Sequence, residues 1–156
     1  MTTLPYRQRL LAMIDALPQE LPILSPPQRT HSNEALASIE QLAFELRLQE
    51  QTYCLVHCLA PERAATAVLE CRLGAPPAEQ PARAIYRRLL QLNLLTAAVH
   101  PFGFGLDAER RELVLSSPLN LQQAGAADLA DLLNATVQIA TAWRLTGFLD
   151  VPLSTS

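Results

Sequence analysis

Three stretches in the first half of the chain carry the apolar pattern of β-strands. Between residues 42 and 48, large apolar side chains alternate with Ala43, Glu45 and Arg47, which places every second residue on the same face of a strand. Residues 52–59 are apolar on both faces, and residues 67–73 alternate again, with Glu70 and Arg72 on the outer face. Because only short polar turns separate these stretches, the sequence predicts an antiparallel meander.

A helix is predicted after this meander, with Pro81 in its first turn. Apolar residues recur along it in two neighbouring rows with helical spacing. The rows are Ile85, Leu89 and Leu92, and Tyr86, Leu90 and Leu94. Together they form an apolar sector wider than one sheet requires, so we expect this helix to cover two surfaces.

Beyond this helix the apolar period returns to two residues. Residues 102–107 and 113–115 flank a charged turn, which predicts a hairpin. Asp107 is expected to start the turn by accepting bonds from downstream backbone, and Pro118 is expected to end the second strand. The two glycines of the first strand, in the run FGFG, are interpreted as sites of close approach by a backbone or a side chain.

Two amphipathic helices are predicted at the ends of the chain. The first is capped by Thr2 or Thr3 and stopped by Pro18, and the last starts near Asp128 and ends near Gly147. The apolar face of the first helix comprises Leu10, Leu11, Ile14 and Leu17. The stripe of the last helix comprises Leu129, Leu132, Leu133, Val137, Ala140 and Trp143. Residues 18–33 are expected to form an irregular, partly extended connector, and residues 33–39 either a short helix, which we favour, or the start of a strand.

The order of these elements predicts an α+β fold in which three helices lie against a twisted antiparallel sheet of about five strands. Its length of 156 residues suits a single domain over residues 1–150, followed by a flexible tail at 151–156. A net charge of −3 and a pI near 5.6 argue against a nucleic-acid-binding protein. No stretch approaches the roughly 18 uninterrupted apolar residues of a membrane span, so we expect a soluble, cytoplasmic protein.

Few residues in the chain suggest catalysis or metal binding. Cys54 and Cys58 would share one face of a strand but lie about 13 Å apart, while His57 would point to the opposite face. We therefore expect the cysteines, including Cys71, to be structural, with no metal, cofactor or catalytic group. His31 and His100 are expected to be solvated.

Two further residues carry alternative interpretations. Asn93 is either a surface residue of the central helix or the source of a hydrogen bond that fixes the following segment. Trp143 is expected in the core rather than at a binding surface.

The series LLQLNLL, FGFGLD, ELVLSSPLNL and a final helix containing Ala142-Trp143 resembles the small dimeric class I chaperones of bacterial type III secretion. This is the family typified by the chaperone of the translocated intimin receptor. CRLGAPP, at residues 71–77, resembles the same family, and the resemblance runs from about residue 43 to 145. Residues 18–39 depart from the family pattern by their length.

The resemblance implies a homodimer that binds the N-terminal segment of a secreted effector in extended form and keeps it competent for export. The secretion ATPase is a further implied partner. By the same resemblance the central helix supplies the dimer interface, through Ile85, Tyr86, Leu89, Leu90 and Leu92. The candidate effector-binding patch comprises Leu10, Leu11, Ile14 and Leu17 of the first helix, with Phe44 and Leu46 of the first strand.

Two other classes of function remain open. A regulatory binding module on the same fold, such as an anti-activator, differs from a chaperone only in its partner. A small enzyme would need converging polar residues, and a loss of activity on replacing Cys54 or His57 would support it.

Overall fold

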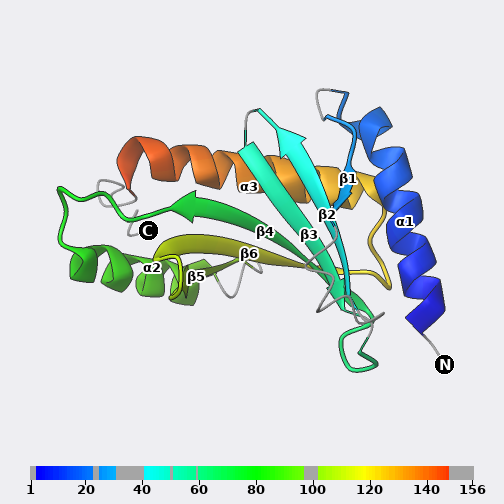
Figure 1. Cartoon of the computed structure of the whole chain (residues 1–156), viewed down its shortest axis with the longest axis horizontal. Coiled ribbons are helices and arrows are strands. Elements are labelled where there is room, and N and C mark those ends of the chain that lie inside the picture. Colours follow the sequence, from blue (N-terminus) through cyan, green and yellow to red (C-terminus); the bar gives the residue numbers. More distant parts are fainter. Residues whose placement is uncertain are drawn as a thin grey trace.

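A computed structural model of the chain describes residues 3–22, 25–30, 41–49, 51–58, 60–96 and 102–147. It is an α+β fold with three helices and one antiparallel sheet (Figure 1). The helices are α1 (Thr3–Glu20), α2 (Ala82–Thr96) and α3 (Ala126–Thr146). The strands are β1 (Gln28–Thr30), β2 (Gln41–Leu48), β3 (Gln51–Cys58), β4 (Thr66–Gly74), β5 (Gly103–Asp107) and β6 (Glu112–Asn120).

The sheet has the strand order β1-β2-β3-β4-β6-β5. The predicted meander is confirmed as β2, β3 and β4, and the predicted hairpin as β5 and β6. The hairpin joins the meander through β6, which pairs with β4, so β5 becomes an edge strand. Helix α2 connects β4 to β5 and lies beside the hairpin (Figure 1).

All three helices pack on the same face of the sheet. That face carries Leu55, Leu69 and Leu115, which join the buried residues of α1 and α3 in the main core. A smaller cluster contains Ile85 and Leu89 of α2 with Leu113 of β6 and Trp143 of α3. Trp143 is buried, as predicted, and its indole Nε1 donates to the Leu73 carbonyl oxygen at 3.2 Å. Helix α3 therefore spans the molecule from α1 to α2 (Figure 1).

Two prolines do not act as the stops that the sequence predicts. Helix α1 continues through Pro18 to Glu20, and Leu21 still donates its backbone N–H to the Leu17 carbonyl oxygen at 2.9 Å. Strand β6 likewise continues through Pro118 to Asn120. Strand β5 pairs with β6 only as far as Ser116. On that side of β6, no described strand therefore faces Pro118, and its missing N–H removes no hydrogen bond there.

A sixth strand lies in the proline-rich connector. Residues 28–30 pair with residues 43–45 of β2, where the sequence predicts an irregular, partly extended segment. With only three residues and prolines just before it, β1 carries no alternation that could reveal a strand. The short helix expected at 33–39, the two loop histidines His31 and His100, and the tail lie outside the described residues.

The predicted hairpin turn and the predicted ends of α3 agree with the structure. Asp107 Oδ1 accepts the backbone N–H groups of Glu109 and Arg110, both at 3.1 Å. Asp128 lies in the first turn of α3, where its carboxylate accepts the Gly125 N–H at 2.7 Å. Gly147 ends α3 in the left-handed region, with φ of 56°, where a glycine avoids the Cβ clash.

Candidate functional site

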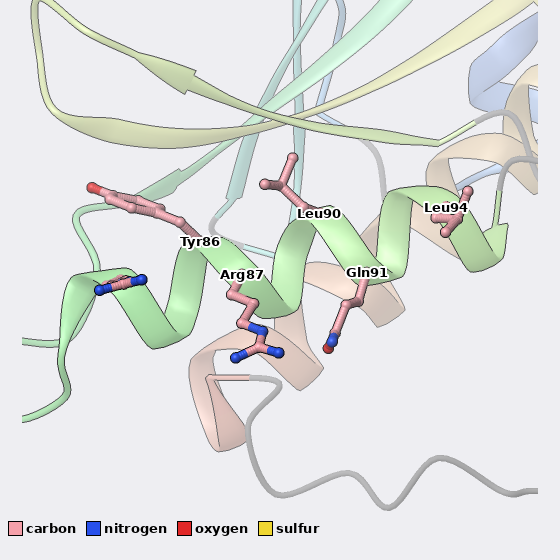
Figure 2. A pocket seen from close by; sticks show the side chains of 6 residues that line it. Tyr86, Arg87, Leu90, Gln91 and Leu94 are labelled. Carbon is pink, nitrogen blue, oxygen red and sulfur yellow. The ribbon is translucent and has the colours of Figure 1, made fainter.

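Large exposed apolar side chains gather on α2 and β5. Leu90 is 68% exposed and Leu94 is 80% exposed, and both belong to α2. Leu95 follows them, and Leu106 on the edge strand is about half exposed. Figure 2 shows Tyr86 and Leu90 on the side of α2 toward the hairpin, while Arg87 and Gln91 point away from it. We call this surface, made of Tyr86, Leu90, Leu94 and Leu106, the α2–β5 face.

An apolar hollow of about 160 Å³ lies within the α2–β5 face. It opens between α2 and β5 and is lined chiefly by apolar side chains, with Asn93 among them. The Asn93 amide pairs with the backbone of Phe104: Oδ1 accepts the N–H at 2.7 Å and Nδ2 donates to the carbonyl oxygen at 3.0 Å. The interpretation of Asn93 as a hydrogen-bonding residue is therefore confirmed.

The residues predicted for a dimer interface divide between this face and the core. Tyr86 and Leu90 line the α2–β5 face. Ile85 and Leu89 are buried against Leu113 and Trp143 of the same chain, and Leu92 is partly buried beside them. Ile85 and Leu89, which were predicted for the dimer interface, are therefore buried within the subunit, because their row of α2 turns toward its own sheet.

Sequence reasoning did not assign Leu94 or Leu106 to an interface. Leu94 stands four residues after Leu90, and this spacing alone places the two leucines on one face of a helix. Leu106 pairs with Leu113 across the hairpin, at the free edge of the sheet. Only the position of β5 at that edge exposes its side chain.

The residues predicted for an effector-binding patch are mostly core residues. Five of the six have at most 6% of their surface exposed: Leu10, Ile14, Leu17, Phe44 and Leu46. The side chains of α1 cover the same face of β2 that carries Phe44 and Leu46, so each set buries the other. Leu11, on the outer side of α1, is the one exposed member, at 37%. The predicted patch is thus corrected to Leu11 alone as exposed surface.

The opposite face of the sheet has no described helix against it. Its side chains form rows across the strands, as the register shows. One row is apolar and consists of Ala43, Val56, Val68 and Pro118. The next row is polar or ionisable at each position and consists of Glu45, Cys54, Glu70 and Ser116. We call these two rows the open face. None of their residues belongs to either core cluster, although Ala43 is itself buried, with 8% of its surface exposed.

A second hollow, of about 650 Å³, lies on the open face beside Val56 and Val68, the two central members of the apolar row. It is lined by Gln41, Val56, Cys58, Glu62, Arg63, Thr66, Val68 and Glu70. The glycines of β5 also belong to this side of the sheet, yet a Cβ added at Gly103 would lie 3.6 Å from Ser116 Oγ, an ordinary contact. The expected close approach at the FGFG glycines is therefore absent from the described contacts.

Ion pairs account for most of the charges near the open face. Arg47 Nε lies 2.8 Å from Glu45 Oε1. Arg72 Nη1 lies 3.0 Å from Asp107 Oδ2 and 3.1 Å from Glu112 Oε2. Within the part of the chain that the structure describes, Glu70 forms no ion pair. The Glu70 carboxylate therefore has no ion-pair partner among the described residues.

The cysteines and the strand histidine are placed on opposite faces, as predicted. Cys54 and Cys58 are partly exposed on the open side of β3, whereas His57 is buried and its Nε2 lies 2.8 Å from the Ala64 carbonyl oxygen. Cys71 is fully buried, and burial raises the pKa of its thiol to about 11. Burial, and then the Glu70 carboxylate, also raises the pKa of Cys54. Neither thiol is an activated nucleophile.

The described residues contain no group of three metal-ligating side chains close enough to bind one ion. Across the same residues, no helix combines the length and hydrophobicity needed to cross a bilayer. The surface thus offers apolar and charged contact areas, and the described part of it holds no cluster of ligands for a metal.

Comparisons with solved structures identify the fold. A chain of the HopA1-SchA chaperone-effector complex superposes with a TM-score of 0.60 at 15% identity, covering 94% of this chain and 98% of the other. A chain of the ExsC-ExsE complex superposes with a TM-score of 0.56 at 17% identity, covering 90% and 92% respectively. No curated protein sequence is significantly similar to this chain.

The sequence also matches the Tir chaperone protein (CesT) family over residues 37–144. This stretch includes all the motifs on which the resemblance to type III secretion chaperones rests, from the meander to Trp143 of α3. Because the match covers well over half of the sequence, the chain belongs to the Tir chaperone protein (CesT) family.

Proposed function

We propose that this protein is a cytoplasmic type III secretion chaperone that binds the N-terminal segment of a secreted effector and has no catalytic activity. Membership of the Tir chaperone family carries this proposal. One solved structure with a similar fold is a chain of a chaperone-effector complex, which supports an effector as the partner of this chain. The bound segment would stay extended, so that it remains soluble and competent for export.

The contact surfaces of the chain support a role in binding. Among the described residues, the large apolar side chains that are exposed are leucines, which gain free energy from burial at roughly 25 cal/mol per Å² without requiring a particular partner sequence. Burial raises the pKa of the partly exposed Cys54 thiol, and the buried His57 is bonded to a backbone carbonyl. These features suit a protein that holds another chain.

We further propose that the α2–β5 face joins two copies in a homodimer. Leu90, Leu94 and Leu106 expose apolar surface on adjacent elements, and Tyr86 extends it. Exposing an apolar face of this kind to water is unfavourable. In a dimer with a two-fold axis near α2, the same face of each copy would bury that of the other. The interface is then built from Tyr86, Leu90, Leu94 and Leu106, with Ile85 and Leu89 supporting α2 from beneath.

The test is a deletion of the gene in its native host, combined with capture of partners on the tagged chain. We expect a secreted protein to copurify, its isolated N-terminal segment to suffice for binding, and its secretion to fall in the deletion strain. Complementation by the wild-type gene is the control. Copurification of a transcription factor, with unchanged secretion, would replace the chaperone by the regulatory module. The secretion ATPase should join the complex only when the effector is bound.

A further inference from the structure

The open face is a second contact surface, separate from the α2–β5 face. Phe104 and Leu106 pair with Leu115 and Leu113, whose side chains belong to the helix-covered side of the sheet. Val56 and Val68 alternate with core residues of their strands and so lie on the other side. A second copy docked on the α2–β5 face would therefore leave the open face accessible.

The open face offers small apolar side chains next to a carboxylate. Val56 and Val68 pair directly across β3 and β4, and Ala43 and Pro118 continue their row to the neighbouring strands. Glu70 stands two residues after Val68, on the same face of β4, and pairs with Cys54 on one side and Ser116 on the other. Side chains this short let the backbone of a bound segment approach the sheet closely.

We propose that the open face binds a basic, extended segment of the effector, with aliphatic side chains over Val56 and Val68 and a lysine or arginine paired with Glu70. This inference rests on the proposed function, since it names the place and the chemistry of effector binding. The hollow of about 650 Å³ beside Cys58 has room for one or more side chains of such a segment.

The charges around Glu70 indicate which charge a bound segment should carry. Glu45 is already paired with Arg47, and Arg72 is held by Asp107 and Glu112, so neither arginine neutralises Glu70. The lining of the hollow has two carboxylates, from Glu62 and Glu70, against the single guanidinium of Arg63. An acidic segment would be repelled here, whereas a basic one would gain a charge-assisted hydrogen bond beside apolar surface.

The experiment uses the effector segment that copurifies with the wild-type chain, prepared as a purified peptide. Binding is measured by calorimetry to the wild type and to Glu70→Lys and Val68→Asp variants. We expect each variant to bind at least about tenfold more weakly. Glu109→Lys, which changes an exposed carboxylate in the hairpin turn, is the matched control and should bind like the wild type. Circular dichroism verifies that each variant is folded.

Thiol labelling provides a second measurement that needs no variant. Cys58 lines the hollow and Cys71 is buried, so iodoacetamide should label Cys58 in the free protein and leave Cys71 unmodified. Bound peptide should slow the labelling of Cys58 severalfold. Unchanged affinity of both variants and unchanged labelling of Cys58 would overturn the open face as the binding site while leaving the chaperone proposal intact. A wild-type chain that captures no secreted protein would overturn both.

Discussion

The side chain of Asn93 pairs with the backbone of Phe104 as a neighbouring strand would. Its amide accepts the Phe104 N–H at 2.7 Å and donates to the Phe104 carbonyl oxygen at 3.0 Å. Phe104 lies on the edge strand β5, and its backbone groups point away from β6. One residue of α2 thus occupies the edge of the sheet at Phe104, which protects this part of the edge from pairing with another strand.

Replacing Asn93 with alanine should destabilise the protein by about 1–3 kcal/mol, because two hydrogen bonds are lost and two partly buried backbone groups are left unpaired. Urea unfolding followed by circular dichroism measures this change. Asn134→Ala, at an exposed site of α3, is the control and should stay within about 0.5 kcal/mol of the wild type. Equal stability of the two variants would mean that the Asn93 amide contributes nothing to holding β5.

Neighbouring leucines of α2 should respond differently to arginine. Leu90→Arg should give a folded monomer, because Leu90 is exposed in the subunit and the added charge would be buried only in a dimer. Leu89→Arg should unfold the subunit, at a cost above about 3 kcal/mol, because Leu89 is buried beside Trp143. Light scattering gives the mass and circular dichroism the fold. Leu145→Arg changes an exposed leucine of α3 and should leave the mass unchanged; a Leu90→Arg variant with the mass of a dimer would remove Leu90 from the interface.

The sequence was sufficient to predict most elements of the fold. Alternation identified β2 to within one residue, since its predicted range of 42–48 compares with Gln41–Leu48. The helix period and the capping residues located α3 and its end at Gly147. Both signals are local, because a strand or helix that must bury one face repeats its apolar residues with the period of its own backbone.

Which apolar residues remain exposed could not be predicted in the same way. Leu10 and Leu90 belong to equally apolar helical rows, yet Leu10 is buried and Leu90 is exposed. The difference arises from tertiary packing: α1 lies on α3 and the sheet, whereas Leu90 lies at the hollow between α2 and β5, where no further described element covers it. The open face was missed for a related reason, since its apolar row exists only across four strands and never along one of them.

Trp143 should contribute strongly to the attachment of α2. It shares a buried cluster with Ile85, Leu89 and Leu113 and donates a hydrogen bond to the Leu73 carbonyl oxygen. Trp143→Ala should lower the free energy of unfolding by about 3–5 kcal/mol. Trp143→Phe should lower it less, because an aromatic ring still fills part of the space, although the hydrogen bond to the Leu73 carbonyl oxygen is lost. Thermal and urea unfolding by circular dichroism measure both. Leu145→Ala, two residues away and exposed, serves as the control, and a cost for Trp143→Ala as small as that of Leu145→Ala would contradict this role.

Acid should weaken the hairpin through Asp107. The N–H of Arg110, and then the Arg72 guanidinium, lower the pKa of this carboxyl below its usual value of 3.8. A lowered pKa means that the folded state favours the ionised form, so the contribution is complete above the unfolded pKa and is lost as pH falls through the lower folded pKa. Asp107→Asn should therefore melt below the wild type at neutral pH, and the difference should shrink as the pH falls below the unfolded pKa of about 3.9. Melting temperatures across this range provide the measurement, with Glu109→Gln as the control. A difference that stays constant with pH would show that the charge of Asp107 is not what stabilises the turn.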